Sequence, residues 1–246
     1  PFNSEIKKNR DKIFVIDYKN TLRCFKINNG SECWNLQTED SFTLSGIKYS
    51  LIISNDMVVF SNSIGDITAV DEQTGLILWQ LPTQSSNIVN ETYDFKNSKI
   101  VSDGNSIYFS NNKNEFYSID AKTGTTNWTN EINSTITPII INNLIFTVSE
   151  EGYLYVIEKN EGNIIRISNL FTSYKEKIRK NLKPIGFAIG NLNLYLTNSN
   201  GDIIVSDLNS GSILNKKKIG NNLISRPFIY NNSLFVVRNG SIVKYN

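Results

Sequence analysis

The sequence predicts an all-β protein, a β-propeller built from about six repeats of a four-stranded antiparallel sheet. Glycines that end a polar turn recur along the chain at separations of 45, 49, 38 and 49 residues, within the range of propeller blades. Short β-branched and aromatic runs lie between turn signals. Helical periodicity is almost absent, and its one candidate is the short polar segment 173–181. The recurrent glycines are Gly30, Gly75, Gly124, Gly162 and Gly211.

A stricter spacing divides each repeat. Ten residues before each recurrent glycine the chain has glycine or asparagine, the residues that best tolerate a positive φ. This series is Asn20, Gly65, Asn114, Gly152 and Gly201, and Gly240 continues it. A third turn signal lies nine residues further upstream in each unit. Strand, tight turn, strand, tight turn, strand describes an antiparallel meander, and an apolar run before it supplies the fourth strand.

We therefore expect one propeller domain spanning 1–246. Its repeat units are predicted at 1–38, 39–83, 84–133, 134–170, 184–220 and 221–246, with an insertion at 168–184. The chain starts at Pro1, with neither an initiator methionine nor a signal sequence, so we expect it to be processed or truncated.

Composition excludes several functions. The 246 residues include no histidine, which excludes Ser-His-Asp and Cys-His catalysis and every histidine-containing metal site. The formal net charge of +2 is too balanced for a nucleic-acid coat across the whole chain, so nucleic acid is not an expected partner. No apolar run reaches the roughly 18 to 20 residues that span a bilayer.

Acidic and tryptophan residues recur at fixed places in the repeat. An acid stands four residues before the recurrent glycine in four units, and a tryptophan stands four residues after it in three. A role that recurs once per blade is architectural: the acid accepts hydrogen bonds from the N–H groups of the turn, and the tryptophan packs between sheets. The structural positions are Trp34, then Asp71, Thr74, Gly75 and Trp79, then Asp120, Thr123, Gly124 and Trp128; Arg166 and Asn215 replace tryptophan in later units.

The segment from Ala69 to Trp79 resembles the tryptophan-docking motif of quinoprotein-type propellers, A-x-D-x-x-T-G-x-x-x-W. Ser118 to Trp128 repeats it with only the alanine changed. In that superfamily the motif locks adjacent blades together. Quinoprotein dehydrogenases of the superfamily carry pyrroloquinoline quinone and calcium beside a disulfide of adjacent cysteines. This chain has no such cysteine pair, and no set of acids can be assigned as calcium ligands with a base.

The chain also resembles the BamB family, non-catalytic propeller lipoproteins of the outer-membrane β-barrel assembly machinery. The similarity is strongest near the end of the chain, in 182–187, 194–197, 200–203, 234–237 and 240–243. It implies a scaffold without cofactor or metal, at the periplasmic face of the outer membrane of a Gram-negative bacterium. The implied partner is the periplasmic part of the central BamA-like subunit. BamB has eight blades and a lipidated cysteine, so the six units here would form part of a larger propeller. The alternative is a fragment of a quinone-dependent dehydrogenase or another ligand-binding propeller enzyme.

The insertion is a candidate partner-binding loop, because it is basic and partly aromatic. Charge complementarity would steer an acidic partner onto it, and aromatic or arginine anchors would supply affinity. The alternative is a solvated loop without a partner. Its basic residues are Lys175, Lys177, Arg179, Lys180 and Lys183, against the single acid Glu176.

Two cysteines, Cys24 and Cys33, flank the turn at Gly30. A hairpin would bring them close enough to pair. We favour two buried thiols over a disulfide, since bridges between neighbouring strands are geometrically demanding.

Overall fold

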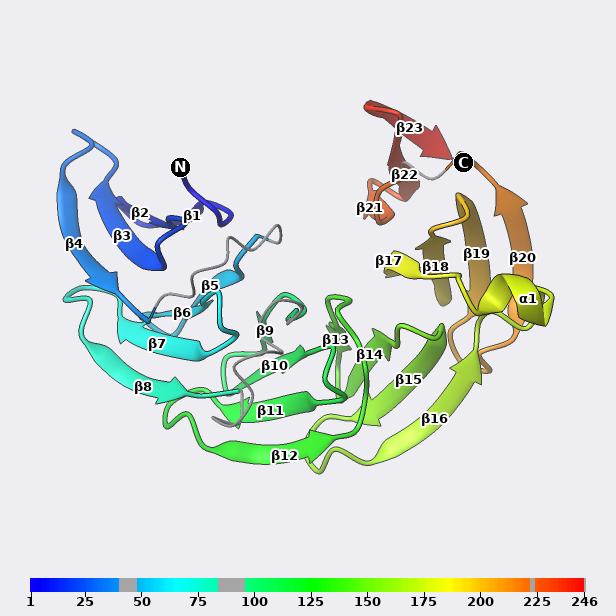
Figure 1. Ribbon diagram of the computed structural model, residues 1–246, viewed down its shortest axis with the longest axis horizontal. Helices are drawn as coiled ribbons and strands as arrows, with labels where there is room; N and C mark the ends of the chain where they lie inside the picture. Colours follow the sequence, from blue (N-terminus) through cyan, green and yellow to red (C-terminus); the bar gives the residue numbers. More distant parts are fainter. Residues whose placement is uncertain (40–47, 84–95, 222–223, 246) are drawn as a thin grey trace. The chain divides into compact units, whose positions relative to one another are not determined.

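The computed structural model describes residues 1–39, 48–83, 96–221 and 224–245. The remaining parts of the predicted units 39–83, 84–133 and 221–246 lie outside the described residues. Contacts group the chain into two compact units, Pro1–Glu131 and Ile132–Asn246, and each contains three antiparallel sheets (Figure 1). The prediction of an all-β protein with a propeller blade architecture is confirmed, and the expectation of a single domain stays a prediction.

Three four-stranded sheets form the first unit, each with its strands in chain order. The first sheet contains β1 (Lys7–Asn9), β2 (Lys12–Ile16), β3 (Thr21–Lys26) and β4 (Glu32–Gln37). The second contains β5 (Leu51–Ser54), β6 (Met57–Ser61), β7 (Ile67–Asp71) and β8 (Ile77–Leu81). The third contains β9 (Val101–Ser102), β10 (Ser106–Ser110), β11 (Phe116–Asp120) and β12 (Thr126–Asn130). The first strands β1, β5 and β9 contact one another in sequence, so they lie at the inner side of the unit.

The second unit repeats the pattern. Its first sheet contains β13 (Ile139–Ile141), β14 (Leu144–Val148), β15 (Tyr153–Glu158) and β16 (Ile164–Asn169). The next contains β17 (Pro184–Gly190), β18 (Asn193–Asn198), β19 (Asp202–Asp207) and β20 (Ile213–Lys218). The last contains β21 (Phe228–Tyr230), β22 (Ser233–Arg238) and β23 (Ser241–Tyr245), three strands within the described residues where four were expected. The helical segment expected at 173–181 is a single turn, α1 (Glu176–Arg179).

Turns at the predicted positions make these meanders possible. The six residues of the glycine and asparagine series all have positive φ, from +58° at Asn20 to +91° at Gly65. The left-handed conformation costs little for glycine and asparagine, which explains why only these two residue types occupy the series.

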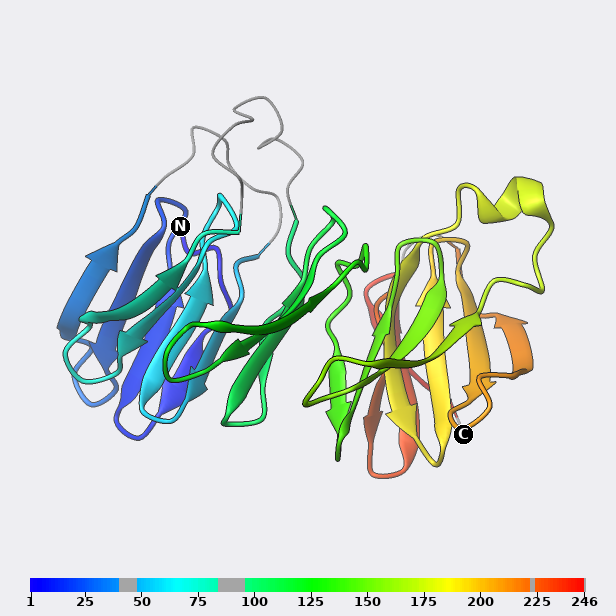
Figure 2. The ribbon, with the colours of Figure 1, turned by 90° about the horizontal axis from the view of Figure 1, so that it is seen from below.

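The core lies between the faces of successive sheets. In the first unit, Phe14 and Leu22 of one sheet pack with Val58 and Phe60 of the next, and all four side chains are fully buried. In the second unit, Val156 of β15 packs with Leu196 of β18 and Ile204 of β19. Figure 2 shows the sheets of each unit standing face to face. Burial of these apolar faces is the main stabilising contribution in a stack of this kind.

Candidate functional site

The recurrent acid organises the turn before the fourth strand. Asp71 Oδ1 accepts hydrogen bonds from the N–H groups of Gln73 and Thr74, at 3.0 and 2.7 Å, and from the Thr74 hydroxyl at 2.7 Å. Asp120 makes the same contacts with Lys122 and Thr123. The Thr74 hydroxyl and N–H hold the pKa of Asp71 below its usual value, because they stabilise the charged form.

Tryptophan side chains join adjacent sheets in the first unit. Trp34 Nε1 donates a hydrogen bond to the Glu72 carbonyl at 3.2 Å, and Trp79 Nε1 donates to the Ala121 carbonyl at 2.9 Å. Each ring also lies on the recurrent glycine of the next sheet. A Cβ at Gly75 would come within 2.6 Å of the Trp34 ring. The glycine therefore permits both the left-handed turn and the close approach of the indole.

A β-bulge lies immediately before each docking position. In all five four-stranded sheets, the register between the third and fourth strands shifts by one residue. In the second sheet, Ala69 pairs with Trp79 and Val70 pairs with Ile77, so Leu78 is the extra residue. Bulges bend a strand and re-aim its side chains. Here the bulge leaves Leu78 half exposed while Trp79 is 8% exposed.

Arg166 takes the place of tryptophan in the second unit. Its guanidinium donates to the carbonyls of Leu208, at 2.7 Å, and Asn209 in the next sheet. Leu208 follows the turn acid Asp207, as Ala121 follows Asp120. The sequence shows the substitution, but arginine at a strand residue ordinarily indicates a solvated side chain. Its docking contacts emerge only from the structure.

Trp128 lies in the last sheet of the first unit. Its ring stacks on Phe116 of the same sheet, with centroids 5.9 Å apart and an angle of 11° between the planes. Tyr108 is a second aromatic neighbour, at 6.2 Å. The inter-blade role expected for Trp128 stays a prediction.

Cys24 and Cys33 form a disulfide, so the preference for two thiols was wrong. The bulge explains the pairing. Cys24 pairs in register with Trp34 and Phe25 pairs with Glu32, which leaves Cys33 as the extra residue opposite Cys24. The Cα atoms lie 5.2 Å apart, within the usual range for a disulfide.

The insertion is anchored to the second unit by apolar and aromatic side chains. Phe171 is fully buried, and its ring leaves no space for a Cβ on Gly152. Tyr174 is 7% exposed; its hydroxyl donates to Asp202 Oδ2 at 2.7 Å and accepts from Asn198 Nδ2 at 2.9 Å. Burial, together with the hydrogen bond to Asp202, raises the pKa of Tyr174. These aromatics fix the loop to its own blades, and contact between the insertion and a partner stays a prediction.

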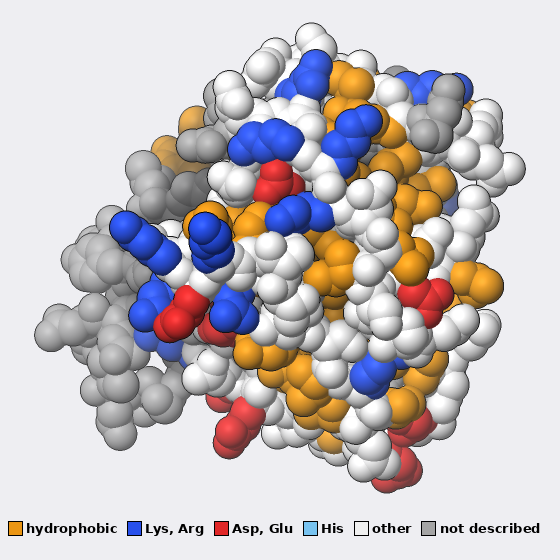
Figure 3. Space-filling view, turned by 90° about the vertical axis from the view of Figure 1, so that its right-hand side faces the viewer, with side chains coloured by type: hydrophobic (Ala, Val, Ile, Leu, Met, Phe, Trp, Pro, Cys, Tyr) orange, Lys and Arg blue, Asp and Glu red, His pale blue; other side chains and the backbone are white. Residues whose placement is uncertain are grey.

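The basic side chains of the insertion remain accessible. Figure 3 shows Lys and Arg side chains gathered on this side of the molecule. Lys180 pairs with Glu176 at 3.4 Å, and Lys183 pairs with Glu150 at 3.6 Å. The other three basic residues, Lys175, Lys177 and Arg179, form no ion pair with a described residue. The structure thus places all five expected basic residues on one anchored loop.

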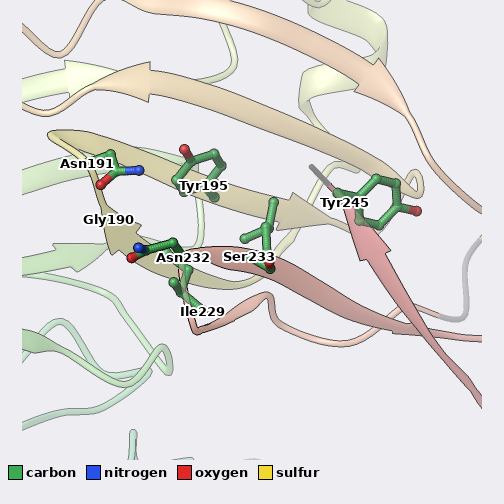
Figure 4. A pocket seen from close by; sticks show the side chains of 8 residues that line it. Gly190, Asn191, Tyr195, Ile229, Asn232, Ser233 and Tyr245 are labelled. Carbon is green, nitrogen blue, oxygen red and sulfur yellow. The ribbon is translucent and has the colours of Figure 1, made fainter.

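A pocket of about 280 Å³ lies between the fifth and sixth sheets (Figure 4). Its lining consists of apolar and uncharged polar residues, among them Tyr195, Ile229, Asn232 and Tyr245. Pyrroloquinoline quinone carries three carboxylates and acts with calcium, which needs oxygen ligands with negative charge. The pocket supplies neither cations for the quinone nor carboxylates for the metal, so this group does not fit it.

Within the described ranges, no group of three or more Asp, Glu, Cys or His side chains is placed to hold a metal ion. None of their helices is long and apolar enough to cross a membrane.

Stacked four-stranded meanders, joined by a side chain that reaches the turn of the next sheet, define a propeller protein with docked blades. A family model described as outer membrane protein assembly factor BamB matches residues 1–168, and the chain belongs to this family. The prediction of a BamB-like protein is confirmed. BamB of Shewanella oneidensis is 24% identical over 147 residues, which are 56% of this chain and 34% of that protein. The chain thus matches about a third of the length of this curated relative.

Solved structures show the same fold. BamB from Moraxella catarrhalis superposes with a TM-score of 0.62 at 16% identity, over 99% of this chain and 82% of that chain. Sqt1 from Saccharomyces cerevisiae superposes with a TM-score of 0.72 at 12% identity, over 96% of this chain and 67% of that chain. The computationally designed protein Ika8 superposes with a TM-score of 0.54 at 11% identity, over 99% of this chain and 95% of that chain. At these identities the likeness concerns the fold alone.

Proposed function

We infer that the protein acts without catalysis, as an accessory scaffold of the machinery that assembles β-barrels in the outer membrane. The observation that carries this proposal is the family match over 1–168, which includes the docked sheets with Trp34 and Trp79. Family membership supports a protein-interaction role in outer-membrane assembly. The periplasmic location, a lipid anchor on the whole protein and the identity of the partner subunit belong to the proposal.

Rigid presentation of loops is the proposed mechanism. Each tryptophan or arginine dock joins one sheet to the turn of its neighbour, so the loops at the sheet ends keep fixed positions relative to one another within a unit. A preorganised surface loses little conformational entropy on binding, which favours association with the periplasmic part of a BamA-like subunit. The outer edge of a sheet can also accept an extended segment of a nascent barrel by strand addition.

Co-purification tests the scaffold proposal. The tagged protein should retain the central barrel-assembly subunit from detergent-solubilised membranes of its own bacterium. A matched variant, Trp79→Ala, should retain less of it because its sheets are no longer locked together. Retention of no assembly subunit by the wild-type protein would overturn the proposal.

The shared docking motif favours one rival function, a fragment of a quinone-dependent dehydrogenase. Adding pyrroloquinoline quinone with calcium distinguishes the two. A scaffold gives no new absorbance band and no dye-linked alcohol oxidation, whereas measurable oxidation would favour the enzyme.

A further inference from the structure

The insertion in the second unit projects beyond the ends of the neighbouring strands, with α1 at its tip (Figure 2). Its base is held firmly. Besides the buried Phe171 and Tyr174, Lys216 of β20 donates a hydrogen bond to the Ser173 carbonyl at 3.2 Å. The same ammonium lies 4.1 Å from the centre of the Tyr174 ring. The tip is therefore a short, supported projection.

The charge on this projection is strongly one-sided. Of its five basic residues, two are paired with acids, Lys180 with Glu176 and Lys183 with Glu150. Lys175, Lys177 and Arg179 add three positive charges, and no acid is paired with them within the described residues. The outer strand β20 ends nearby in three exposed lysines, Lys216, Lys217 and Lys218. We call the insertion residues 175–183 together with Lys216–Lys218 the basic tip surface.

The apolar part of the basic tip surface is small. Ile178 of α1 is 44% exposed. The aromatic residues of the insertion, which would make the strongest anchors for a protein partner, are buried at its base. A folded partner would thus meet this projection without an aromatic anchor.

An anionic bilayer suits such a surface better than a folded protein does. Four to eight basic residues around an apolar side chain bind acidic headgroups without a shaped pocket, because the attraction is diffuse and the lipids rearrange. We propose that the basic tip surface docks on anionic phospholipid, with Lys175, Lys177 and Arg179 at the headgroups and Ile178 in the interface. This goes beyond the scaffold role, since a scaffold can bind its protein partner without touching lipid.

Vesicle co-sedimentation tests the proposal. The probes are large vesicles of phosphatidylcholine alone and of phosphatidylcholine with about 30% phosphatidylglycerol, an anionic content at which basic clusters bind. The protein should sediment with the mixed vesicles only, and binding should weaken as salt is raised. Lys175→Gln, Lys177→Gln and Arg179→Gln in one variant should lower the partition coefficient about 100-fold, since each basic residue contributes roughly a factor of five. Ile178→Ser should lower it about three- to fivefold, through loss of one partly buried side chain.

The matched control removes the same charge from the other unit. Lys8→Gln, Lys19→Gln and Lys26→Gln in one variant change exposed lysines far from the insertion in sequence. This control should bind the mixed vesicles within about twofold of wild type, if binding is local rather than a response to net charge. An equal fall of the partition coefficient in the two triple variants would overturn the proposal. Equal binding of the wild-type protein to both vesicle types would overturn it as well.

A protein-binding role would give a different result. If the Lys175, Lys177 and Arg179 variant binds vesicles normally but no longer co-purifies with the barrel-assembly subunit, the surface is a protein site and the lipid proposal is wrong. If it loses vesicle binding and still co-purifies with that subunit, both the lipid site and the separate scaffold role are supported.

Discussion

Trp79 Nε1 donates a hydrogen bond to the Ala121 carbonyl at 2.9 Å, 42 residues along the chain and in the next sheet. The indole ring lies directly on Gly124, and the side chain is 8% exposed. One residue thus supplies apolar burial, a hydrogen bond and a shape that only glycine accommodates. The relationship shows what joins one sheet to the next: a large side chain from the fourth strand and a turn that exposes backbone to receive it.

Trp79→Ala should lower the free energy of unfolding by about 3 to 5 kcal/mol, the range for removal of a buried large side chain. Urea unfolding followed by circular dichroism measures the change. Leu78→Ala is the matched control: the neighbouring bulge residue is 49% exposed, and its loss should cost less than about 1 kcal/mol. A loss below about 1 kcal/mol for Trp79→Ala would show that the ring does not lock the sheets.

Gly124→Ala and Gly30→Ala separate backbone strain from the close approach of the indole. Both glycines have similar positive φ, +74° and +70°, so each alanine pays a left-handed penalty of roughly 1 to 2 kcal/mol. At Gly30 nothing lies within 4 Å of the new Cβ, whereas at Gly124 the Trp79 ring would be 2.6 Å away. Gly124→Ala should therefore lower the free energy of unfolding by about 1 to 3 kcal/mol more than Gly30→Ala does, the range for overpacking. Equal losses in urea unfolding would mean that the ring moves aside freely.

Local features of the sequence predicted much of this fold. Positive φ is a property of a single residue, so the glycine and asparagine series marked the turns correctly, including Asn20 and Gly152. The choice of docking residue is less local. Arg166 gave no sign of its role, because its acceptors are two backbone carbonyls that any sequence at 208–209 would offer.

Residue spacing alone does not predict the disulfide or the burial of the aromatic side chains in the insertion. A one-residue bulge decides whether Cys33 faces Cys24, and nothing in the residue types marks that shift. Tyr174 is buried in an apolar cluster, and its hydroxyl is bound by Asp202 and Asn198, more than 20 residues away along the chain. The sequence of this segment therefore indicates a partner-binding aromatic loop, whereas in the structure its aromatic side chains anchor the base of the loop to the second unit.

Removal of the disulfide should destabilise the first unit. The bridge closes a loop with a sequence separation of 9, for which loss of chain entropy in the unfolded state gives about 2 to 3 kcal/mol. Cys24→Ala with Cys33→Ala should show this loss in urea unfolding under oxidising conditions. Wild-type protein treated with a thiol reductant should move toward the variant, and the variant itself should not respond. Identical unfolding of reduced and oxidised wild type would contradict the prediction.

Arg166→Met keeps the length of the side chain and removes its donors. The Leu208 and Asn209 carbonyls then lose their guanidinium partner, which should cost about 1 to 3 kcal/mol. The free energy of unfolding of Arg166→Lys should fall between those of wild type and Arg166→Met, because one ammonium cannot reproduce the planar donor arrangement of the guanidinium. Hydrogen exchange at the 207–212 turn, read by mass spectrometry, should speed up in the methionine variant. Unchanged exchange there would show that the arginine does not hold the next sheet.

Glu5 should make stability depend on pH. The hydrogen bond from the Lys99 ammonium, aided by Lys7 and opposed by burial, lowers the pKa of Glu5 to about 2. The unfolded carboxyl has a higher pKa, about 4.3, so the unfolded chain binds the proton more readily as the solution is acidified. The stabilising contribution is therefore complete above pH of about 4.5 and is lost as the pH falls toward about 2.

Glu5→Gln should flatten this part of the pH profile of the unfolding free energy, and Lys99→Gln should do the same by removing the donor. Because both side chains are about 40% exposed, salt should weaken the effect as well. Urea unfolding at a series of pH values between about 1.5 and 7 measures it, a window that brackets both pKa values of this carboxyl. If Glu5→Gln keeps the full acid slope of wild type, the Lys99 contact does not hold Glu5 in its charged form. If the Glu5→Gln and Lys99→Gln double variant loses no more slope than either single change, the two residues act as one pair, since coupled groups are not additive.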